Sequence, residues 1–279
     1  MDLDDASARA PGPPRMFDVV CAGASSLVVG ADGTMRVGGG AARTALALAR
    51  HDLRAGLATV LGDDTTGRAI RTKIAATGVD VGGLVLAPPS SGLLFVRGGA
   101  LQSLGEGREA PPVAIPEGWS SSVLLLSGMS PAISHAAALC KAARAARRVG
   151  TIVVVDLHAD WSEWKGRNWR SVRMLLGEAD VVWASSEDLA GLSLDPPSVR
   201  AAMRRDAVFV RHHVGRVSAT GRFGEVSHPS KLGPVDADDD FVAAIAFELV
   251  HAQGSFGTTP AIWSRALARG HAAVVRTRR

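Results

Sequence analysis

Short apolar runs rich in valine and leucine alternate with alanine-rich stretches of helical periodicity along most of the chain. Such runs, bounded by turn residues, are typical of strands in a parallel sheet, and the stretches between them are typical of the helices that cover it. The pattern therefore predicts an α/β protein of three layers, with a mostly parallel central sheet between two layers of helices. The expected strands are 17–23, 55–61, 122–128, 151–157, 180–185 and 207–212, and the expected helices are 43–51, 65–77, 131–149, 169–177, 197–204, 239–253 and 260–275.

The pattern changes between residues 81 and 105, where short extended pieces replace the alternation of strand and helix. Turns are expected at Pro88-Pro89 and Gly98-Gly99. Without a helix of their own, these pieces are expected to form antiparallel strands. Together with about 25–37, residues 81–105 are predicted to build a small β flap, or lid, that projects from the main sheet and closes over a ligand.

Length and composition fit one large globular domain over 16–279, preceded by a flexible tail at 1–15. The net charge of +4 and the sequence pI of 9.7 do not indicate nucleic-acid binding, because the arginines are scattered and no stacking aromatics lie among them. The start of the chain lacks an apolar signal core, and no apolar run reaches the length of a membrane span. Cys21 and Cys140 lie in separate apolar segments without metal-ligand spacing, so we expect a reduced, cytoplasmic protein with two core thiols.

Four carboxylates crowd the start of one predicted helix in the stretch "GPVDADDDFVAAIAFELV". These are Asp236, Asp238, Asp239 and Asp240. One or two acidic residues are expected there, because they cap the free N–H groups of the first turn and favour the positive end of the helix dipole. Four exceed what capping uses, since their mutual repulsion grows while the number of free N–H groups stays fixed. The cluster therefore indicates that these carboxylates have a role other than capping the helix.

A phosphate-binding loop of the Walker type is not present at the glycine-spaced stretch "GDDTTGRA", which covers 62–69. The chemistry of that loop needs a lysine followed by a serine or threonine, and Arg68 and Ala69 stand there instead.

The order of several segments resembles the ribokinase-like (PfkB) family of carbohydrate and nucleoside kinases over nearly the whole of 16–279. The stretch "VGGGAARTALALAR" matches the family's glycine pair and first helix, and "TVLGDDTTGRAIRTKIAATGVD" matches its G-x-D-x-x-G segment. A central strand is matched by "LLLSG". The D-x-N-x-R strand end is matched by "VVVDLHADWSEW", and the N-x-x-E segment by "ADVVWASSEDLAGL". The aspartate-rich stretch aligns with the family signature G-A-G-D-x-F. The resemblance implies a ribokinase-like fold.

The resemblance also implies transfer of a phosphoryl group from ATP, with Mg²⁺, to a hydroxyl of a sugar or nucleoside. Backbone N–H groups of the signature form the family's anion hole, and its aspartate accepts the proton of the acceptor hydroxyl. Aligning Phe241 with the family's phenylalanine makes Asp239 the expected catalytic base. The other implied positions are Gly39, Gly40, Arg43 and Asp156 for substrate, Asp236, Ala237, Asp238 and Arg211 for the nucleotide, and Glu187 for the metal ion.

Several of these positions depart from the family pattern. Asp236 and Asp238 stand where the anion hole has glycines, and Arg43 replaces an asparagine that helps hold the sugar. Val28 or Val29 occupies the region of an early sugar-binding aspartate. Further replacements are Ala184 for asparagine, His158 and Asp160 for asparagine and arginine, and Arg211 for threonine.

Carboxylates in an anion hole repel the incoming phosphate by several kcal/mol at about 4 Å and intermediate dielectric. We therefore expect weak or lost kinase activity. The alternative is a pseudokinase that serves as a ligand sensor or a protein-interaction module. By analogy with the family, dimerisation through the β flap is expected.

Two alternatives assign the altered residues to a metal ion. Asp156, His158 and Asp160 alternate along a strand end and would point to one face, and the carboxylates of 236–240 could hold a divalent ion. The other interpretation is that they are solvated polar residues. The tryptophans of this region stack on a ligand ring or, more simply, cover the sheet; they are Trp161, Trp164 and Trp169.

Overall fold

The computed structural model describes residues 16–88, 93–97, 100–104, 112–128, 133–158, 169–213, 215–230, 238–252, 256–257 and 259–277. Several predictions fall on positions outside these ranges: the N-terminal tail, Asp160, Trp161, Trp164, Asp236 and Ala237.

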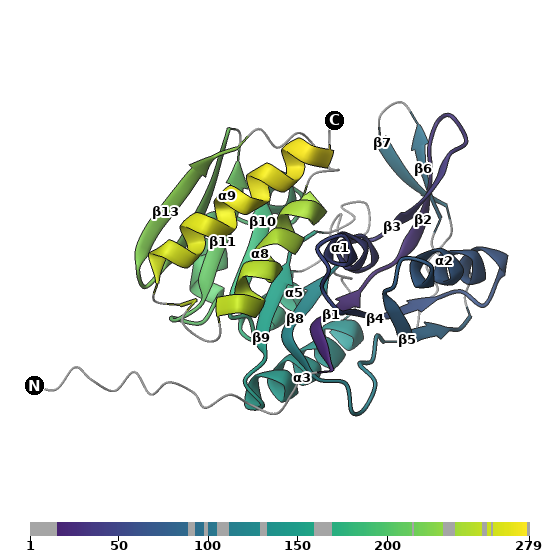
Figure 1. Ribbon diagram of the computed structural model, residues 1–279, viewed down its shortest axis with the longest axis horizontal. Coiled ribbons are helices and arrows are strands. Elements are labelled where there is room, and N and C mark those ends of the chain that lie inside the picture. The colour runs from purple at the N-terminus through teal and green to yellow at the C-terminus, as the bar shows by residue number, and fades with distance from the viewer. Residues whose placement is uncertain are drawn as a thin grey trace, which may run out of the picture.

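A twisted sheet of nine strands runs through the described part of the chain in the order β13-β12-β11-β10-β9-β8-β1-β4-β5 (Figure 1). All pairings from β5 to β11 are parallel, and β12 and β13 add an antiparallel hairpin at one edge. The mostly parallel α/β fold predicted from the pattern is thus confirmed. The strands are β1 (Phe17–Gly23), β4 (Ala55–Leu61), β5 (Asp80–Leu86), β8 (Ser121–Ser127), β9 (Ile152–Asp156), β10 (Val181–Ser185), β11 (Val208–His213), β12 (Arg216–Gly221) and β13 (Gly224–Pro229).

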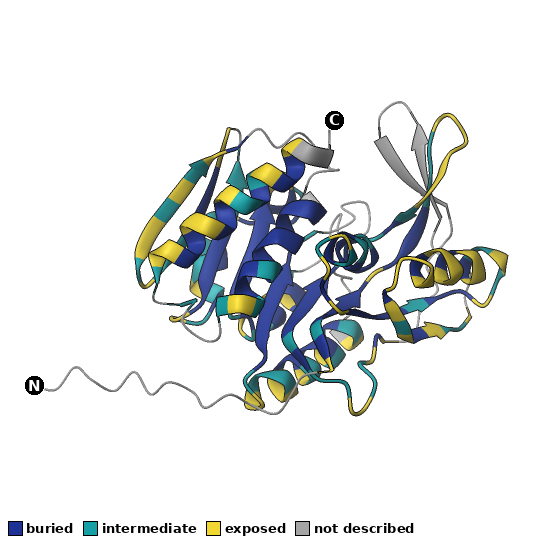
Figure 2. Cartoon of the chain, in the orientation of Figure 1, coloured by how far each residue is buried: buried dark blue, intermediate teal, exposed yellow. Residues whose placement is uncertain are grey.

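Helices cover both faces of this sheet because alternate strand residues point to opposite sides. Val19 and Cys21 pack toward one helix layer, whereas Val20 and Ala22 of the same strand pack toward the other. The central strands β1, β4, β8, β9 and β10 are accordingly buried almost throughout, whereas the edge strands β13 and β5 are partly exposed, as Figure 2 shows. One layer holds α1 (Gly40–Ala49), α2 (Thr65–Ala75), α8 (Asp238–Ala252) and α9 (Pro260–Thr277); the other holds α3 (Ile133–Arg148), α5 (Arg170–Leu176), α6 (Ser186–Gly191) and α7 (Pro196–Ala202).

Local capping sets where several helices begin. The Asp64 carboxylate accepts a hydrogen bond from the Gly67 N–H at 2.7 Å and starts α2. Asp195 caps α7 in the same way, followed by a proline at the first helical position. The short helix α6 was not predicted from the apolar pattern, because it is only 6 residues long and begins directly after β10.

A separate sheet of four strands, in the order β3-β2-β6-β7, forms the predicted flap. Its strands are β2 (Ser26–Val29), β3 (Met35–Gly38), β6 (Leu93–Arg97) and β7 (Ala100–Leu104). One part of the prediction is wrong: residues 80–86 do not join the flap but pair parallel with β4 as the edge strand of the main sheet. The helix α2 lies between the two strands, so β4, α2 and β5 form an ordinary β-α-β crossover that the glycines of "DVGGLVL" obscured.

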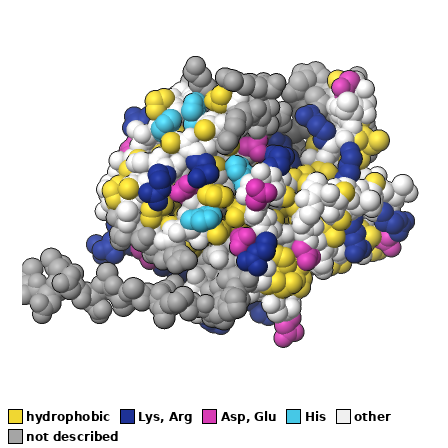
Figure 3. All heavy atoms as spheres, in the orientation of Figure 1, with side chains coloured by type: hydrophobic (Ala, Val, Ile, Leu, Met, Phe, Trp, Pro, Cys, Tyr) yellow, Lys and Arg dark blue, Asp and Glu magenta, His cyan; other side chains and the backbone are white. Residues whose placement is uncertain are grey.

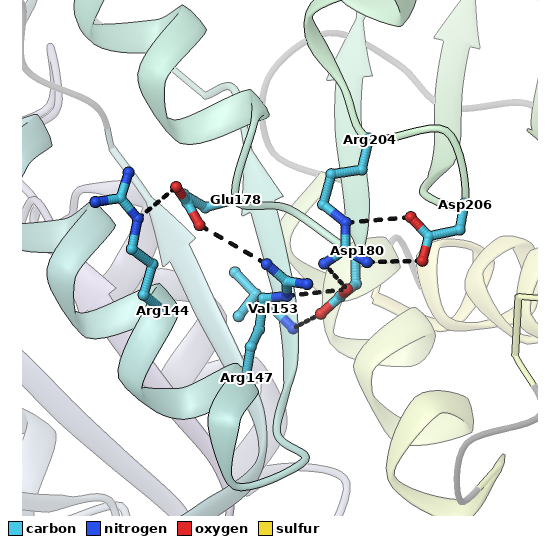
Figure 4. Close-up of polar contacts among 7 residues, drawn as sticks. All are labelled: Arg144, Arg147, Val153, Glu178, Asp180, Arg204 and Asp206. Atoms are coloured by element: carbon cyan, nitrogen blue, oxygen red, sulfur yellow. Dashed lines mark hydrogen bonds and ion pairs between the residues drawn. The ribbon is translucent and has the colours of Figure 1, made fainter.

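A network of ion pairs joins α3 to the amino ends of β9, β10 and β11 (Figure 4). Arg144 contacts Glu178 at 2.6 Å, and Arg204 reaches Asp180 at 3.3 Å. The Asp180 carboxylate also accepts a hydrogen bond from the backbone N–H of Val153 at 2.9 Å. This network lies at the edge opposite the carboxyl ends of the strands, so we assign it to the stability of the sheet.

The face over α8 and α9 carries basic and acidic side chains side by side (Figure 3). Among the described helices, none combines the length and the apolar character needed to cross a membrane.

Candidate functional site

The candidate site lies where the carboxyl ends of the central parallel strands meet the amino end of α1 and the start of α8. In open α/β sheets, ligands bind at this edge of the strands. Ser127 ends β8 and Asp156 ends β9, and the two residues are partners in the register of these strands. The sequence resemblance placed its candidate residues along the same edge.

The glycine pair Gly39-Gly40 brings the start of α1 against the ends of β1 and β8. A Cβ on Gly39 would come within 2.6 Å of the Ser25 Cα, and Gly39 has a φ of 82°. A Cβ on Gly40 would lie 2.0 Å from the Ser127 hydroxyl oxygen. These contacts leave no room for a side chain, so both glycines are required by the close approach of backbone in the site.

Arg43 and Asp239 form an ion pair across the site. The guanidinium nitrogen of Arg43 lies 2.6 Å from a carboxylate oxygen of Asp239, and only 20% and 9% of the two side chains are exposed. Arg43 comes from α1 and Asp239 from the first turn of α8. The residue that replaces the family's asparagine therefore contacts the expected catalytic base.

A second ion pair joins the same two helices. Arg50, at the C-terminal end of α1, contacts Asp240, which follows Asp239. Arg50 is largely exposed, whereas Asp240 is buried. Two of the four crowded carboxylates are thus compensated by arginines of α1, which explains how the start of α8 tolerates their repulsion.

Asp156 is buried at the end of β9 and accepts a hydrogen bond from the Ser127 hydroxyl at 2.6 Å. Burial raises the pKa of the Asp156 carboxyl to about 6. The carboxylates of Asp188 and Asp239 add to this rise, while His158 and the Ser127 hydroxyl oppose it. Asp156 therefore lies inside a cluster of acidic groups from three elements.

His158 lies within this acidic cluster, and its backbone N–H donates to Asp156 at 3.2 Å. Burial favours the neutral imidazole and Arg43 acts in the same direction, but the carboxylates of Asp156, Asp239 and Asp188 outweigh them and raise the pKa of His158. The three buried carboxylates thus favour the charged form of the histidine.

The N-x-x-E segment contributes a second acidic residue beside the predicted Glu187. Glu187 is exposed in the first turn of α6. Its neighbour Asp188 is buried, and burial raises the pKa of its carboxyl against the opposing effects of His158 and of the hydrogen bonds from Ser185. The Ser185 hydroxyl and N–H donate to Asp188 at 2.7 and 2.9 Å, in a capping box. The S-x-x-D spacing is a signal that could have identified Asp188 from the sequence.

The remaining predicted positions are not joined to this cluster by contacts between described residues. Arg211 lies half-buried on β11 on the same side as Phe209, which packs toward the helix layer opposite α8. The ring of the next residue, His212, is stacked on Trp183 with centroids 6.5 Å apart. Asp238 opens α8, and Phe241 is fully buried against Trp183 with centroids 4.9 Å apart.

Among the described residues, no group of three or more histidine, cysteine, aspartate or glutamate side chains is placed to hold a metal ion. Glu187 points to solvent, and Asp188 is engaged by Ser185. We therefore assign no step to a metal ion.

The raised pKa of Asp156 predicts a distinctive pH dependence of stability. Between 3.8, the ordinary pKa of an aspartate side chain, and about 6, the folded protein holds a proton on Asp156 that the unfolded chain has lost. The contribution of Asp156 to stability therefore falls as the pH rises through this window. Asp156→Asn should remove that loss, raising the free energy of unfolding relative to wild type by roughly 2–3 kcal/mol at pH 8 and by far less at pH 4.5. Urea unfolding at both pH values measures this.

The control for this prediction is Asp195→Asn. The hydrogen bonds from Ser198 lower the pKa of Asp195, so its removal should reduce stability at pH 8 and not increase it. An effect of Asp156→Asn that is the same at pH 4.5 and pH 8 would contradict a raised pKa.

Comparisons with known proteins agree with the fold described above. Residues 16–196 match the model of the pfkB family carbohydrate kinases. A fructokinase from Vibrio cholerae O395, solved with fructose, ADP and calcium ion bound, superposes with a TM-score of 0.76 at 20% identity, covering 91% of this chain and 90% of that one. An aminoimidazole riboside kinase from Salmonella enterica gives a TM-score of 0.75 at 20% identity, with 92% of each chain covered.

A PfkB protein from Polaromonas sp. JS666 gives a TM-score of 0.71 at 24% identity, covering 92% of this chain and 96% of that one. No curated protein sequence matches the chain. At these identities the solved structures establish the fold, whereas the family model matches more than half of the 279 residues. The chain therefore belongs to the pfkB family of carbohydrate kinases.

Proposed function

We propose that this PfkB-family protein has weak or no phosphoryl-transfer activity and keeps the cleft of the fold as a binding site for a small molecule. The observation that carries the proposal is the ion pair between Arg43 and Asp239 at 2.6 Å. In the family resemblance, Asp239 takes the proton of the acceptor hydroxyl. A general base must be within hydrogen-bond reach of that proton and must be able to accept it.

The ion pair opposes both requirements. A guanidinium in contact with a carboxylate favours its charged form over its protonated form, so proton transfer to Asp239 becomes less favourable. The same contact uses an oxygen that would otherwise face the acceptor hydroxyl. The burial of both side chains strengthens the pair relative to one in water.

The sequence at the anion hole supports the same proposal independently. Asp236 and Asp238 occupy the positions of the family's glycines. A carboxylate there repels a transferring phosphate and prevents the close approach of backbone N–H groups on which the hole depends. Nucleotide binding and base catalysis are therefore both impaired, at neighbouring positions of one segment.

An active sugar kinase is the alternative, and the family to which the chain belongs favours it. In that case ATP is the phosphate donor, a sugar or nucleoside hydroxyl is the acceptor, and Asp239 is the base. Both alternatives require that the cleft bind a ligand. They therefore share the glycines Gly39 and Gly40 and the buried Asp156.

Calorimetry with ATP and ADP, with and without Mg²⁺, combined with an ADP-release assay over a panel of sugars and nucleosides, separates the two. We expect no measurable nucleotide binding at micromolar concentrations and no acceptor-dependent ADP release. Fructose and aminoimidazole riboside belong in the panel because structurally similar kinases act on or bind them. Acceptor-dependent ADP release that Asp239→Ala abolishes would contradict the proposal and assign the active kinase.

A further inference from the structure

The helix α9 and the edge strand β13 meet away from the candidate site, and each contributes a histidine to their contact. α9 packs against β13, which forms the edge of the main sheet opposite β5 (Figure 1). His228 comes from β13 and His271 from α9. Their ring centroids lie 5.4 Å apart, and both residues are half-buried. Two imidazoles from distant parts of the chain thus lie side by side within reach of solvent.

The periodicity of each element turns its histidine toward the other. Alternate residues of a strand share a face, so His228 points to the same side as Val226, which packs against the core that α9 helps to form. On α9, Arg269 contacts Glu248 of α8. His271 follows Arg269 by two residues, or about 200° of rotation around the helix. The helix therefore presents the arginine to α8 and His271 to β13.

A hydrogen bond fixes which ring nitrogen of His228 is available to a ligand. The Nδ1 atom of His228 lies 2.7 Å from the carbonyl oxygen of Pro229. A carbonyl oxygen can only accept, so Nδ1 carries the proton in this bond and the neutral ring keeps its lone pair on Nε2. Histidines that bind metal ions almost always donate their other ring N–H to a carbonyl, a carboxylate or water in this way. His228 is thus held in a tautomer that binds a metal ion through Nε2.

The spacing of the two rings also suits a shared ion. Zinc–nitrogen bonds are about 2.0–2.1 Å long and diverge at tetrahedral angles, which places the centroids of two coordinated imidazoles roughly 5 Å apart. The 5.4 Å between His228 and His271 is close to this value. Arg216 of the same hairpin contacts Glu225 at 3.0 Å and is the register partner of Pro229, so its side chain belongs to the opposite face of β13.

We propose that His228 and His271 form a two-histidine site for a divalent transition-metal ion of the zinc type, which fastens α9 to the edge hairpin. Imidazole nitrogen suits zinc, copper and nickel, whereas magnesium and calcium prefer oxygen ligands. Among the described residues no third histidine, cysteine, aspartate or glutamate joins the pair, so water completes the coordination. The inference goes beyond the proposed function and does not depend on it.

Calorimetry of the full chain with zinc chloride at neutral pH tests the proposal. We expect one Zn²⁺ to bind with micromolar affinity, because two neutral imidazoles supply its ligands. An excess of Mg²⁺ of about a hundredfold should not displace it, since a hard cation gains little from imidazole nitrogen. Absence of zinc binding, or displacement of the zinc by magnesium, would overturn the inference.

Matched histidine variants locate the site. His228→Ala and His271→Ala should each weaken zinc binding by at least about tenfold, because each removes one of the two protein ligands. His251→Ala is the control: its Nδ1 atom lies 2.7 Å from the carbonyl oxygen of Phe247, as in His228, but its ring stacks on Phe247. This control should leave zinc affinity within about twofold. If all three variants weaken binding equally, or none does, the inference fails.

Urea unfolding with and without zinc tests whether the ion joins the two elements. An ion that binds only the folded protein stabilises it, so zinc should raise the urea midpoint of the wild type. The double variant His228→Ala with His271→Ala should unfold cooperatively near the zinc-free wild-type midpoint, because both side chains are only half-buried. Zinc should not shift its midpoint. A zinc-dependent shift that persists in the double variant, or that is absent in the wild type, would overturn the inference.

Discussion

Arg43→Ala is expected to lower the free energy of unfolding by about 3–5 kcal/mol, since removing one partner of a buried ion pair leaves the other charge uncompensated. Asp239 is only 7% exposed and lies near the carboxylates of Asp156 and Asp188. Without the arginine, Asp239 would lose a positively charged partner at a place where other buried carboxylates lie close to His158. Urea unfolding at pH 7 measures the change.

Two further variants test whether the ion pair is the cause. The double variant Arg43→Ala with Asp239→Ala removes both charges, so we expect it to be more stable than Arg43→Ala alone. Arg50→Ala should cost less than Arg43→Ala because 59% of the Arg50 side chain is exposed and water can replace it at Asp240. A double variant no more stable than Arg43→Ala would mean that the arginine stabilises α1 by packing rather than by charge.

The sequence predicts the central sheet well because its strands are apolar on both faces. The first and last residues of β9 and β10 lie within two residues of the predicted ones. Turn residues or helix caps limit these strands on both sides. The hairpin β12–β13 was not predicted, because its residues are half exposed and polar and give no apolar run. The strand β5 was assigned to the flap because glycines at its centre weaken the pattern of a buried strand.

The candidate site could be predicted only in part, because its partners lie far apart along the chain. The sequence shows that Arg43 and the carboxylates before Phe241 depart from the family, but not that Arg43 contacts Asp239. The ion pair joins one departure, Arg43, to Asp239, which aligns with the aspartate of the family signature. The prediction named Glu187 and not its buried neighbour Asp188, because it followed the N-x-x-E motif and did not use the S-x-x-D capping spacing that starts at Ser185.

Restoring the family's residues should restore nucleotide binding. We expect the triple variant Arg43→Asn, Asp236→Gly and Asp238→Gly to bind ATP at least about 100-fold more tightly than wild type. Each carboxylate removed eliminates a repulsion of about 4 kcal/mol at 4 Å and intermediate dielectric, and glycine allows backbone N–H groups to approach the phosphates. Calorimetry with ATP in the presence of Mg²⁺ measures the change.

The same exchange at exposed positions is the control for net charge: Arg216→Asn, Asp63→Gly and Asp206→Gly, whose side chains are 51%, 55% and 53% exposed, should leave ATP affinity near that of wild type. Equal affinities of the restored and control variants would show that repulsion at the start of α8 does not limit nucleotide binding. Adding Asp239→Ala to the restored variant separates binding from chemistry, because the carboxylate freed from Arg43 would then be absent. ATP affinity should persist, while any acceptor-dependent ADP release should be lost, which would identify Asp239 as the base that the ion pair holds out of use.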